Sequence, residues 1–256
     1  MQNQYFNIVV KKILKSRGKV INSEKIKKII NDILESQYSD KKCYKIIYHL
    51  KNRGYLISLK KDIFYVKTPE DEIKEEQLVD QYYWTVLKSH CEQLGTNWYI
   101  GGGKALELNM LNYDIPQEIE IINPFKQSKE SVLSGKFIKF KKYTSGENNL
   151  FKKMKKFTNK IKIGTCTLQI SNIENSILES LYNPDYLTAN YHQELIKKLL
   201  RKHKKTFNFK MVEEIMKTGK HHSSINRLYK IGKSIDPDFA NEILKIIKKY
   251  SFVLDN

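Results

Sequence analysis

Apolar positions in the first 67 residues follow a helical spacing three times and then a strand-like spacing. Residues 5–16, 23–34 and 41–52 each repeat apolar side chains every three or four positions, which predicts three amphipathic helices. Residues 55–59 and 63–66 are short apolar runs on either side of a Lys-Lys-Asp turn, which predicts a β-hairpin. The chain therefore begins with three helices and a hairpin.

Three helices followed by a hairpin resemble a winged helix-turn-helix, in which the third helix contacts DNA. If the apolar side of this helix turns inward, its lysines and tyrosines face outward, where they can contact phosphates, sugars and base edges. The predicted DNA-binding residues lie on this helix, just after it and at the hairpin tip: Lys41, Lys42, Tyr44, Lys45, Tyr48, Lys51, Arg53, Lys60 and Lys61. Lysine lacks the planar fork that reads guanine, so affinity should come mainly from phosphates and fall steeply with salt. An ordinary solvated helix face and a protein-docking module are the alternatives.

Residues 68–80 mark a change in both pattern and charge. Residues 1–67 carry 16 basic and 5 acidic side chains, whereas 68–80 carry one lysine and six acids. Pro69 ends the preceding strand, and a helical apolar spacing follows over about 78–94. We therefore predict a winged-helix domain over 1–67, an acidic linker and helix start over 68–80, and a second domain over 81–256.

The second domain is predicted to be mixed α/β and to end in a helical bundle. Strands are expected at about 98–100, 118–121, 136–143 and 161–170. Ser171 and Glu174 have the spacing of a capping box and should open the next helix. Further helices are expected at about 189–203, 208–218, 221–234 and 237–250. The fold class expected for the whole chain is α+β.

Three consecutive glycines join the first of these strands to a short helix. Glycine lets the backbone turn sharply or approach another group closely, as phosphate-binding turns require. Gly101, Gly102, Gly103 and Lys104 are therefore candidate nucleotide-binding residues. The alternative is that the turn is only a structural junction in the core of the domain.

Two acids follow this turn at a spacing that nucleotidyltransferases use to hold Mg²⁺. Strand alternation places Glu118 and Glu120 on one face, where carboxylates could bind the metal that bridges substrate phosphates. Such enzymes usually use Asp and take a third acid from a later strand, but neither 136–143 nor 161–170 contains an acid. A degenerate nucleotidyltransferase-like fold without activity is the better interpretation, and we expect no cofactor and no metal.

The net charge of +18 extends into the second domain. Residues 136–162 carry ten lysines and one acid, and residues 197–205 carry six basic side chains and no acid. Both segments can be ordinary solvated surfaces of a lysine-rich protein. They can also form a second polyanion surface, for flanking DNA or for RNA.

Cysteine spacing and hydropathy favour the cytoplasm. Cys43, Cys91 and Cys166 lie far apart, which argues against a disulfide scaffold and a zinc site. The sequence has no run of eighteen apolar residues, so no membrane span is expected.

Most of the chain resembles the AbiEi-type antitoxins and transcriptional regulators of type IV toxin–antitoxin systems, including the N-terminal winged helix and three segments of the second domain. These segments are Trp-Tyr-Ile-Gly-Gly-Gly-Lys-Ala-Leu-Glu-Leu at 98–108, Ile-Pro-Gln-Glu-Ile-Glu-Ile-Ile at 115–122, and the stretch from Lys162 to Leu181. The resemblance implies a cytoplasmic autorepressor that binds inverted repeats in double-stranded DNA at its own promoter. It also implies that the C-terminal domain opposes a nucleotidyltransferase-like toxin without forming a tight complex with it.

Overall fold

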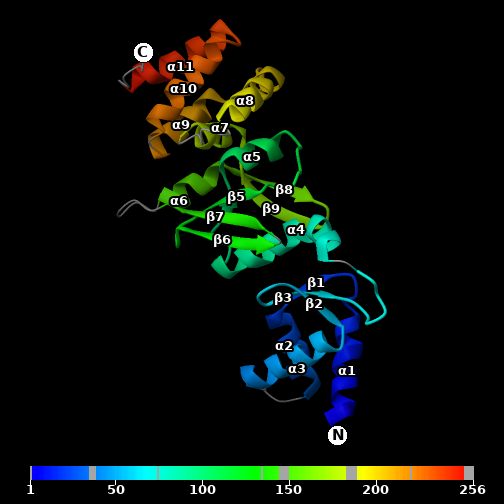
Figure 1. Cartoon of the computed structure of the whole chain (residues 1–256). Helices are drawn as coiled ribbons and strands as arrows, with labels where there is room; N and C mark the ends of the chain where they lie inside the picture. Colours follow the sequence, from blue (N-terminus) through cyan, green and yellow to red (C-terminus); the bar gives the residue numbers. More distant parts are fainter. Residues whose placement is uncertain are drawn as a thin grey trace. The chain divides into compact units, whose positions relative to one another are not determined.

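The computed structural model shows two compact units (Figure 1). The residues that the structure describes are 2–34, 39–73, 75–133, 135–143, 150–182, 189–219 and 221–250. The first unit contains residues 1–93 and 131–136, and the second contains 94–130 and 137–256. Helices and sheets are both present and the C-terminal part is helical, so the predicted α+β class is confirmed.

The first unit combines helices with a three-stranded antiparallel sheet. Its elements are α1 (Gln2–Leu14), β1 (Val20–Asn22), α2 (Ser23–Leu34), α3 (Asp40–Asn52), β2 (Leu56–Lys60), β3 (Ile63–Val66) and α4 (Glu75–Cys91). The three predicted helices and the hairpin are present. The unpredicted strand β1 pairs with β3, which gives the strand order β1-β3-β2. The apolar sides of the first three helices share one core, in which Ile13, Ile30 and Leu50 are fully buried.

Local signals explain where these helices begin and end. Gly18 and Gly54, which follow α1 and α3, have φ angles of 76° and 77°, a conformation that glycine adopts easily. Asn22 caps α2, because its side-chain oxygen accepts the backbone N–H of Lys25 at 2.9 Å.

The acidic stretch after β3 is fixed within the first unit. Asp71 accepts hydrogen bonds from the backbone N–H of Thr68 and from the side chain of Arg17, and these two donors lower the pKa of its carboxyl group. On α4, the hydroxyl group of Tyr82 donates to the carbonyl of Gly18 at 2.7 Å. The unit therefore extends to residue 93, beyond the linker expected at 68–80.

The second unit is built on a six-stranded mixed sheet with the strand order β6-β7-β5-β4-β9-β8, in which only residues 131–136, at the end of β6 and the start of β7, belong to the first unit. The strands are β4 (Tyr99–Ile100), β5 (Glu118–Asn123), β6 (Ser128–Leu133), β7 (Lys136–Lys142), β8 (Thr158–Ile163) and β9 (Cys166–Ser171). The helices are α5 (Gly102–Asn109), α6 (Leu150–Met154), α7 (Ile173–Tyr182), α8 (Ala189–His203), α9 (Phe209–Gly219), α10 (His222–Lys233) and α11 (Pro237–Lys249). Strand β4 lies near the middle of the sheet, antiparallel to β5 and parallel to β9.

The single strand predicted at 161–170 is wrong. This stretch belongs to two antiparallel strands, β8 and β9, which pair Lys162 with Thr167 across a tight turn. Gly164 makes the turn possible with a φ angle of 56°. Strand β6 and the short helix α6 were not predicted.

The predicted capping box at the start of α7 is also wrong in detail. Asn172 caps this helix, because its side-chain oxygen accepts the backbone N–H of Asn175 at 2.9 Å. Ser171 instead donates its hydroxyl hydrogen to Glu179, and Glu174 accepts the backbone N–H of Asn208.

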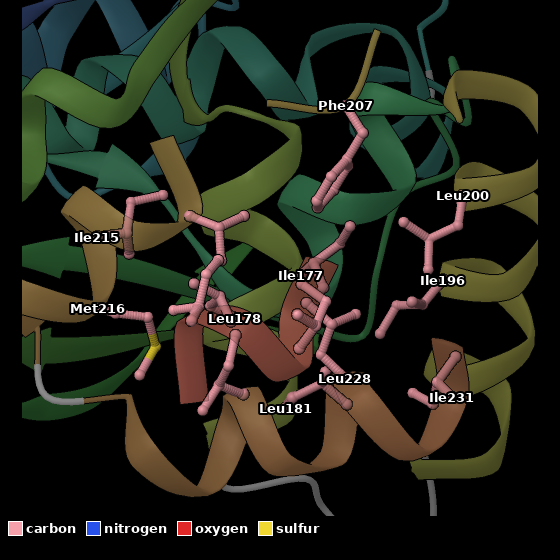
Figure 2. Packing of buried hydrophobic residues seen from close by; sticks show 14 of the residues in the cluster. Ile177, Leu178, Leu181, Ile196, Leu200, Phe207, Ile215, Met216, Leu228 and Ile231 are labelled. Carbon is pink, nitrogen blue, oxygen red and sulfur yellow. The ribbon is translucent and has the colours of Figure 1, made fainter. Parts of the chain in front are cut away.

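The C-terminal helices pack around α7 in one large apolar core (Figure 2). Ile177, Leu178 and Leu181 of α7 contribute to it together with Ile196 of α8 and Leu228 of α10. Helix α11 begins as predicted, with Asp236 as its cap and Pro237 in its first turn. Within the described part of the chain, no helix is both long and apolar enough to cross a membrane.

Candidate functional site

Helix α3 carries most of the predicted DNA-binding residues on the side that faces away from the core. Cys43, Ile47 and Leu50 are buried on its inner side. The lysines and tyrosines between them are exposed: Lys41, Lys42, Tyr44, Lys45, Tyr48 and Lys51. Among the described residues of this unit, Tyr48 has the most exposed large apolar side chain, at 59% exposure.

Tyr44 links α3 to the hairpin. Its hydroxyl group donates to Asp62 Oδ1 at 3.1 Å, and the Lys27 amine lies 4.7 Å from the centre of its ring. Asp62 occupies the turn between β2 and β3 with a φ angle of 62°. The hydrogen bond therefore holds the hairpin turn beside the exposed side of α3.

The remaining predicted DNA-binding residues have different surroundings. The Arg53 guanidinium lies 4.4 Å from the ring centre of Phe6, and the Lys60 amine donates to the carbonyl of Ser131. Lys61 is exposed at the hairpin tip. Arg53 and Lys60 thus already have contacts within the protein, whereas Lys61 lies at the exposed tip of the hairpin.

The three glycines of the second unit are required for different physical reasons. Gly101 has an ordinary extended φ angle of −114°, but a Cβ atom there would lie 2.6 Å from Ile122 Cγ1 and 2.8 Å from Glu179 Oε2. Gly102 has a φ angle of 58°, which disfavours other residues. At Gly103 an added Cβ atom would overlap the ring of His192. Packing and conformation thus explain the run of glycines.

A buried carboxylate occupies the place at this turn where an anion would bind. Glu179 Oε2 accepts the backbone N–H of Gly102 at 3.0 Å and the hydroxyl group of Ser171 at 2.7 Å. Its Oε1 atom accepts the Tyr99 hydroxyl group at 3.0 Å and the Asn175 side-chain amide at 3.1 Å. Burial raises the pKa of Glu179 from 4.5 to about 7, although the hydrogen bonds from Ser171, Gly102 and Tyr99 act in the opposite direction.

The other residues predicted for nucleotide or metal binding are paired within the protein. Lys104 is buried and contacts Glu107 Oε2 at 2.5 Å. Glu118 forms an ion pair with Lys129 at 2.6 Å, and Glu120 forms one with Lys141 at 3.3 Å. Among the described residues, no group of three or more His, Cys, Asp or Glu side chains is placed to hold a metal ion.

His221 lies near Lys141, and no site was predicted for it from the sequence, because it and the adjacent His222 do not share a helical face. His221 is 2% exposed, its ring lies 5.5 Å from the ring of Tyr182, and neither of its nitrogens has a hydrogen-bond partner in the described part of the chain. Burial, together with the nearby charge of Lys141, lowers the pKa of His221 to about 4. The imidazole is therefore neutral at physiological pH.

Comparisons with known proteins identify the fold alone. No protein-family model matches the chain, and no match is found among curated protein sequences. The chain is similar in structure to the RV2827C protein from Mycobacterium tuberculosis, known from a crystal structure. The TM-score is 0.57 over 95% of this chain and 81% of that chain, at 11% sequence identity.

Proposed function

We propose that this protein is a cytoplasmic DNA-binding autorepressor and an antitoxin that opposes a nucleotidyltransferase-like toxin. In this proposal, the first unit is a winged helix-turn-helix domain that binds inverted repeats at the gene's own promoter. The exposed side of α3, with its lysines and tyrosines, is the observation that carries the proposal.

The arrangement around α3 supports a role in duplex binding. The element order α1-β1-α2-α3-β2-β3 places the hairpin directly after the third helix, and the bond between Tyr44 and Asp62 keeps the hairpin turn beside it. A helix in the major groove with a neighbouring hairpin on the backbone would combine base-edge and phosphate contacts. The excess of basic side chains in residues 1–67 favours a polyanionic partner.

The antitoxin role is supported by the resemblance of the second unit to the AbiEi-type family, and the glycine turn agrees with a role outside catalysis. The N–H of Gly102 already has an internal carboxylate as its acceptor, and Glu118 and Glu120 are neutralised by lysines. A Mg²⁺-dependent nucleotidyltransferase would have to break these pairs before it could bind a metal. The transferase alternative therefore has less support.

Replacing Lys45 and Tyr48 together by alanine is expected to weaken binding to the upstream promoter DNA at least tenfold. The double variant loses one phosphate contact and one contact to a base or sugar, so the slope of log affinity against log salt should also fall by about 1. Fluorescence anisotropy with a labelled promoter fragment at several salt concentrations measures both quantities.

The matched control replaces Lys129 and Tyr113, an exposed lysine and an exposed tyrosine of the second unit, by alanine. This variant should bind as tightly as the unmodified protein. Unchanged affinity in the Lys45 and Tyr48 double variant would rule out α3 as the recognition helix. If the unmodified protein ignores the fragment at about 100 mM salt, where phosphate contacts should persist, a protein-interaction module becomes the better assignment.

The antitoxin role has its own test. A nucleotidyltransferase-like reading frame next to this gene should be toxic when expressed alone, and co-expression of this protein should restore growth. Failure to restore growth with the unmodified protein would refute the antitoxin role and leave the repressor role standing.

A further inference from the structure

The C-terminal helices form a groove that the proposed function does not use. Its volume is about 580 Å³, and it lies between α11, the first residue of α9 and the segment that follows α8. Figure 1 shows these helices at the end of the second unit, on the far side of α5 and α7 from the sheet. All of the residues that line the groove belong to this unit.

An aromatic cluster forms one side of the groove. The ring of Phe209 lies 5.2 Å from both Phe207 and Phe239, and these two lie 5.1 Å from each other. Phe207 and Phe239 are buried, whereas Phe209 is only partly buried and lines the groove together with Leu244. The two buried rings hold Phe209 in place, so part of a fixed aromatic surface is open to a ligand.

Basic side chains border this aromatic surface. Lys204, Lys245 and Lys248 line the groove, and the segment 197–205 supplies six basic residues without an acid. Lys204 pairs with Asp236 and Lys245 pairs with Glu242, whereas Lys248 is exposed at the edge of the groove. The lining carries three lysines against the two carboxylates of Asp238 and Glu242, and the neighbouring basic residues of 197–205 add to this excess, which favours a negatively charged ligand.

The groove also offers groups that recognise nucleobases. The Asn241 side chain lines it, and a side-chain amide can donate and accept hydrogen bonds on a base edge. The carboxylates of Asp238 and Glu242 can accept the exocyclic amines of bases. An aromatic face, lysines and base-edge partners within one groove match the way proteins bind unpaired nucleic-acid strands.

We infer that this groove binds single-stranded nucleic acid, with a base stacked on Phe209 and the neighbouring phosphates near Lys248. A duplex does not fit this role, because its bases are already stacked on one another and cannot reach the ring. The inference goes beyond the proposed promoter contact, since it assigns a second site, in a different unit, to a different form of nucleic acid.

The test compares 12-nucleotide strands that carry bases with abasic strands of the same length, at about 50 mM salt and with the full-length protein. Anisotropy should show at least fivefold tighter binding of the strand with bases, because stacking of one base contributes at least that factor. Equal binding of the two strands would overturn the inference, since the protein would then recognise phosphates alone. RNA and DNA versions of the strands show which sugar the groove prefers.

Two variants locate the site. Phe209→Leu keeps an apolar side chain against Phe207 and Phe239, and it should weaken binding of the base-bearing strand about fivefold while leaving the abasic strand unaffected. Lys248→Ala should weaken both strands and reduce the salt dependence. Phe125→Leu and Lys129→Ala, at exposed positions of the same unit, are the controls.

The result for Phe209→Leu decides whether the groove is the site. Base-dependent binding that survives this substitution in a variant with an unchanged melting temperature would place the strand elsewhere on the protein. The Lys45 and Tyr48 double variant should retain single-strand binding, so failure of the promoter contact and failure of this groove can be told apart.

Discussion

The Gly101→Ala variant is expected to lose about 3 kcal/mol of stability in the second unit, the upper end of the usual cost of overpacking. The added Cβ atom would lie 2.6 Å from Ile122 Cγ1 and 2.8 Å from Glu179 Oε2. Ile122 is completely buried on β5 and Glu179 is 4% exposed on α7, so neither side chain has space to move away. Displacing Glu179 would also break its hydrogen bond with the N–H of Gly102.

Urea unfolding measures this effect when the fluorescence reports on the second unit alone. The chain has two tryptophans, Trp84 in the first unit and Trp98 in the second, so a Trp84→Phe background isolates the signal of Trp98. The free energy of unfolding obtained in this background is then compared with and without the Gly101 substitution.

Gly103→Ala provides the matched control, because the same atom is added two residues further along. Its Cβ atom would overlap only the end of the His192 side chain, which is partly exposed and can rotate away. We expect a cost of about 1 kcal/mol, consistent with mild overpacking. Adding His192→Ala to the Gly103→Ala variant should restore most of the stability lost. A Gly101→Ala variant no less stable than Gly103→Ala would show that Ile122 and Glu179 do not restrict this position.

The sequence predicted the helices well because their signals are local. Helix α8 has the predicted bounds, 189–203, and α11 begins at the predicted proline after its Asp236 cap. The outward face of α3 was also predictable, since the position of each side chain follows from helical spacing once the apolar side is buried. Helix α3 is therefore the part of the candidate site that the pattern of residues defines best.

The features that the sequence did not predict depend on contacts between distant residues. The turn at Gly164 is an exception, because the apolar positions change phase there, from Ile161 and Ile163 to Leu168 and Ile170, a local signal that the prediction of one strand overlooked. Glu179 reads as an ordinary helix residue, and its role emerges only when α7 packs beside Gly102, which is 77 residues away in the sequence. Lys104 likewise reads as a possible phosphate ligand until its burial beside Glu107 is known.

The stability of the second unit should decrease as the pH rises from about 4.5 to 7, and Glu179 is the group responsible. Burial raises its pKa from 4.5 to about 7, so the folded protein keeps the proton over a range in which the unfolded chain has already lost it. The favourable contribution is complete below pH 4.5 and is lost as the pH rises through 7. This difference in pKa corresponds to about 3 kcal/mol.

The Glu179→Gln variant tests this expectation because glutamine has a similar shape and does not ionise. Asn175 can accommodate the new amide group, because its Oδ1 atom has no partner among the described residues. If the Asn175 side-chain amide flips, this oxygen can accept a hydrogen bond from the glutamine side chain. The unfolding free energy of the variant minus that of the unmodified protein should therefore increase by about 3 kcal/mol as the pH rises from 4.5 to 8. Urea unfolding followed by Trp98 fluorescence across this range measures the difference.

The difference in unfolding free energy between the variant and the unmodified protein should change with pH if the carboxyl group titrates, and should not if the substitution only disturbs the structure. A substitution that only disturbs packing changes stability by the same amount at every pH, whereas loss of the Glu179 proton gives a difference that grows over the predicted range. Glu214→Gln removes an exposed carboxylate from α9 and should show a nearly constant difference. A constant difference for Glu179→Gln as well would mean that Glu179 is ionised in the folded protein at pH 5. Its four hydrogen bonds would then outweigh burial, and the glycine turn would hold a permanent negative charge beside the N–H of Gly102.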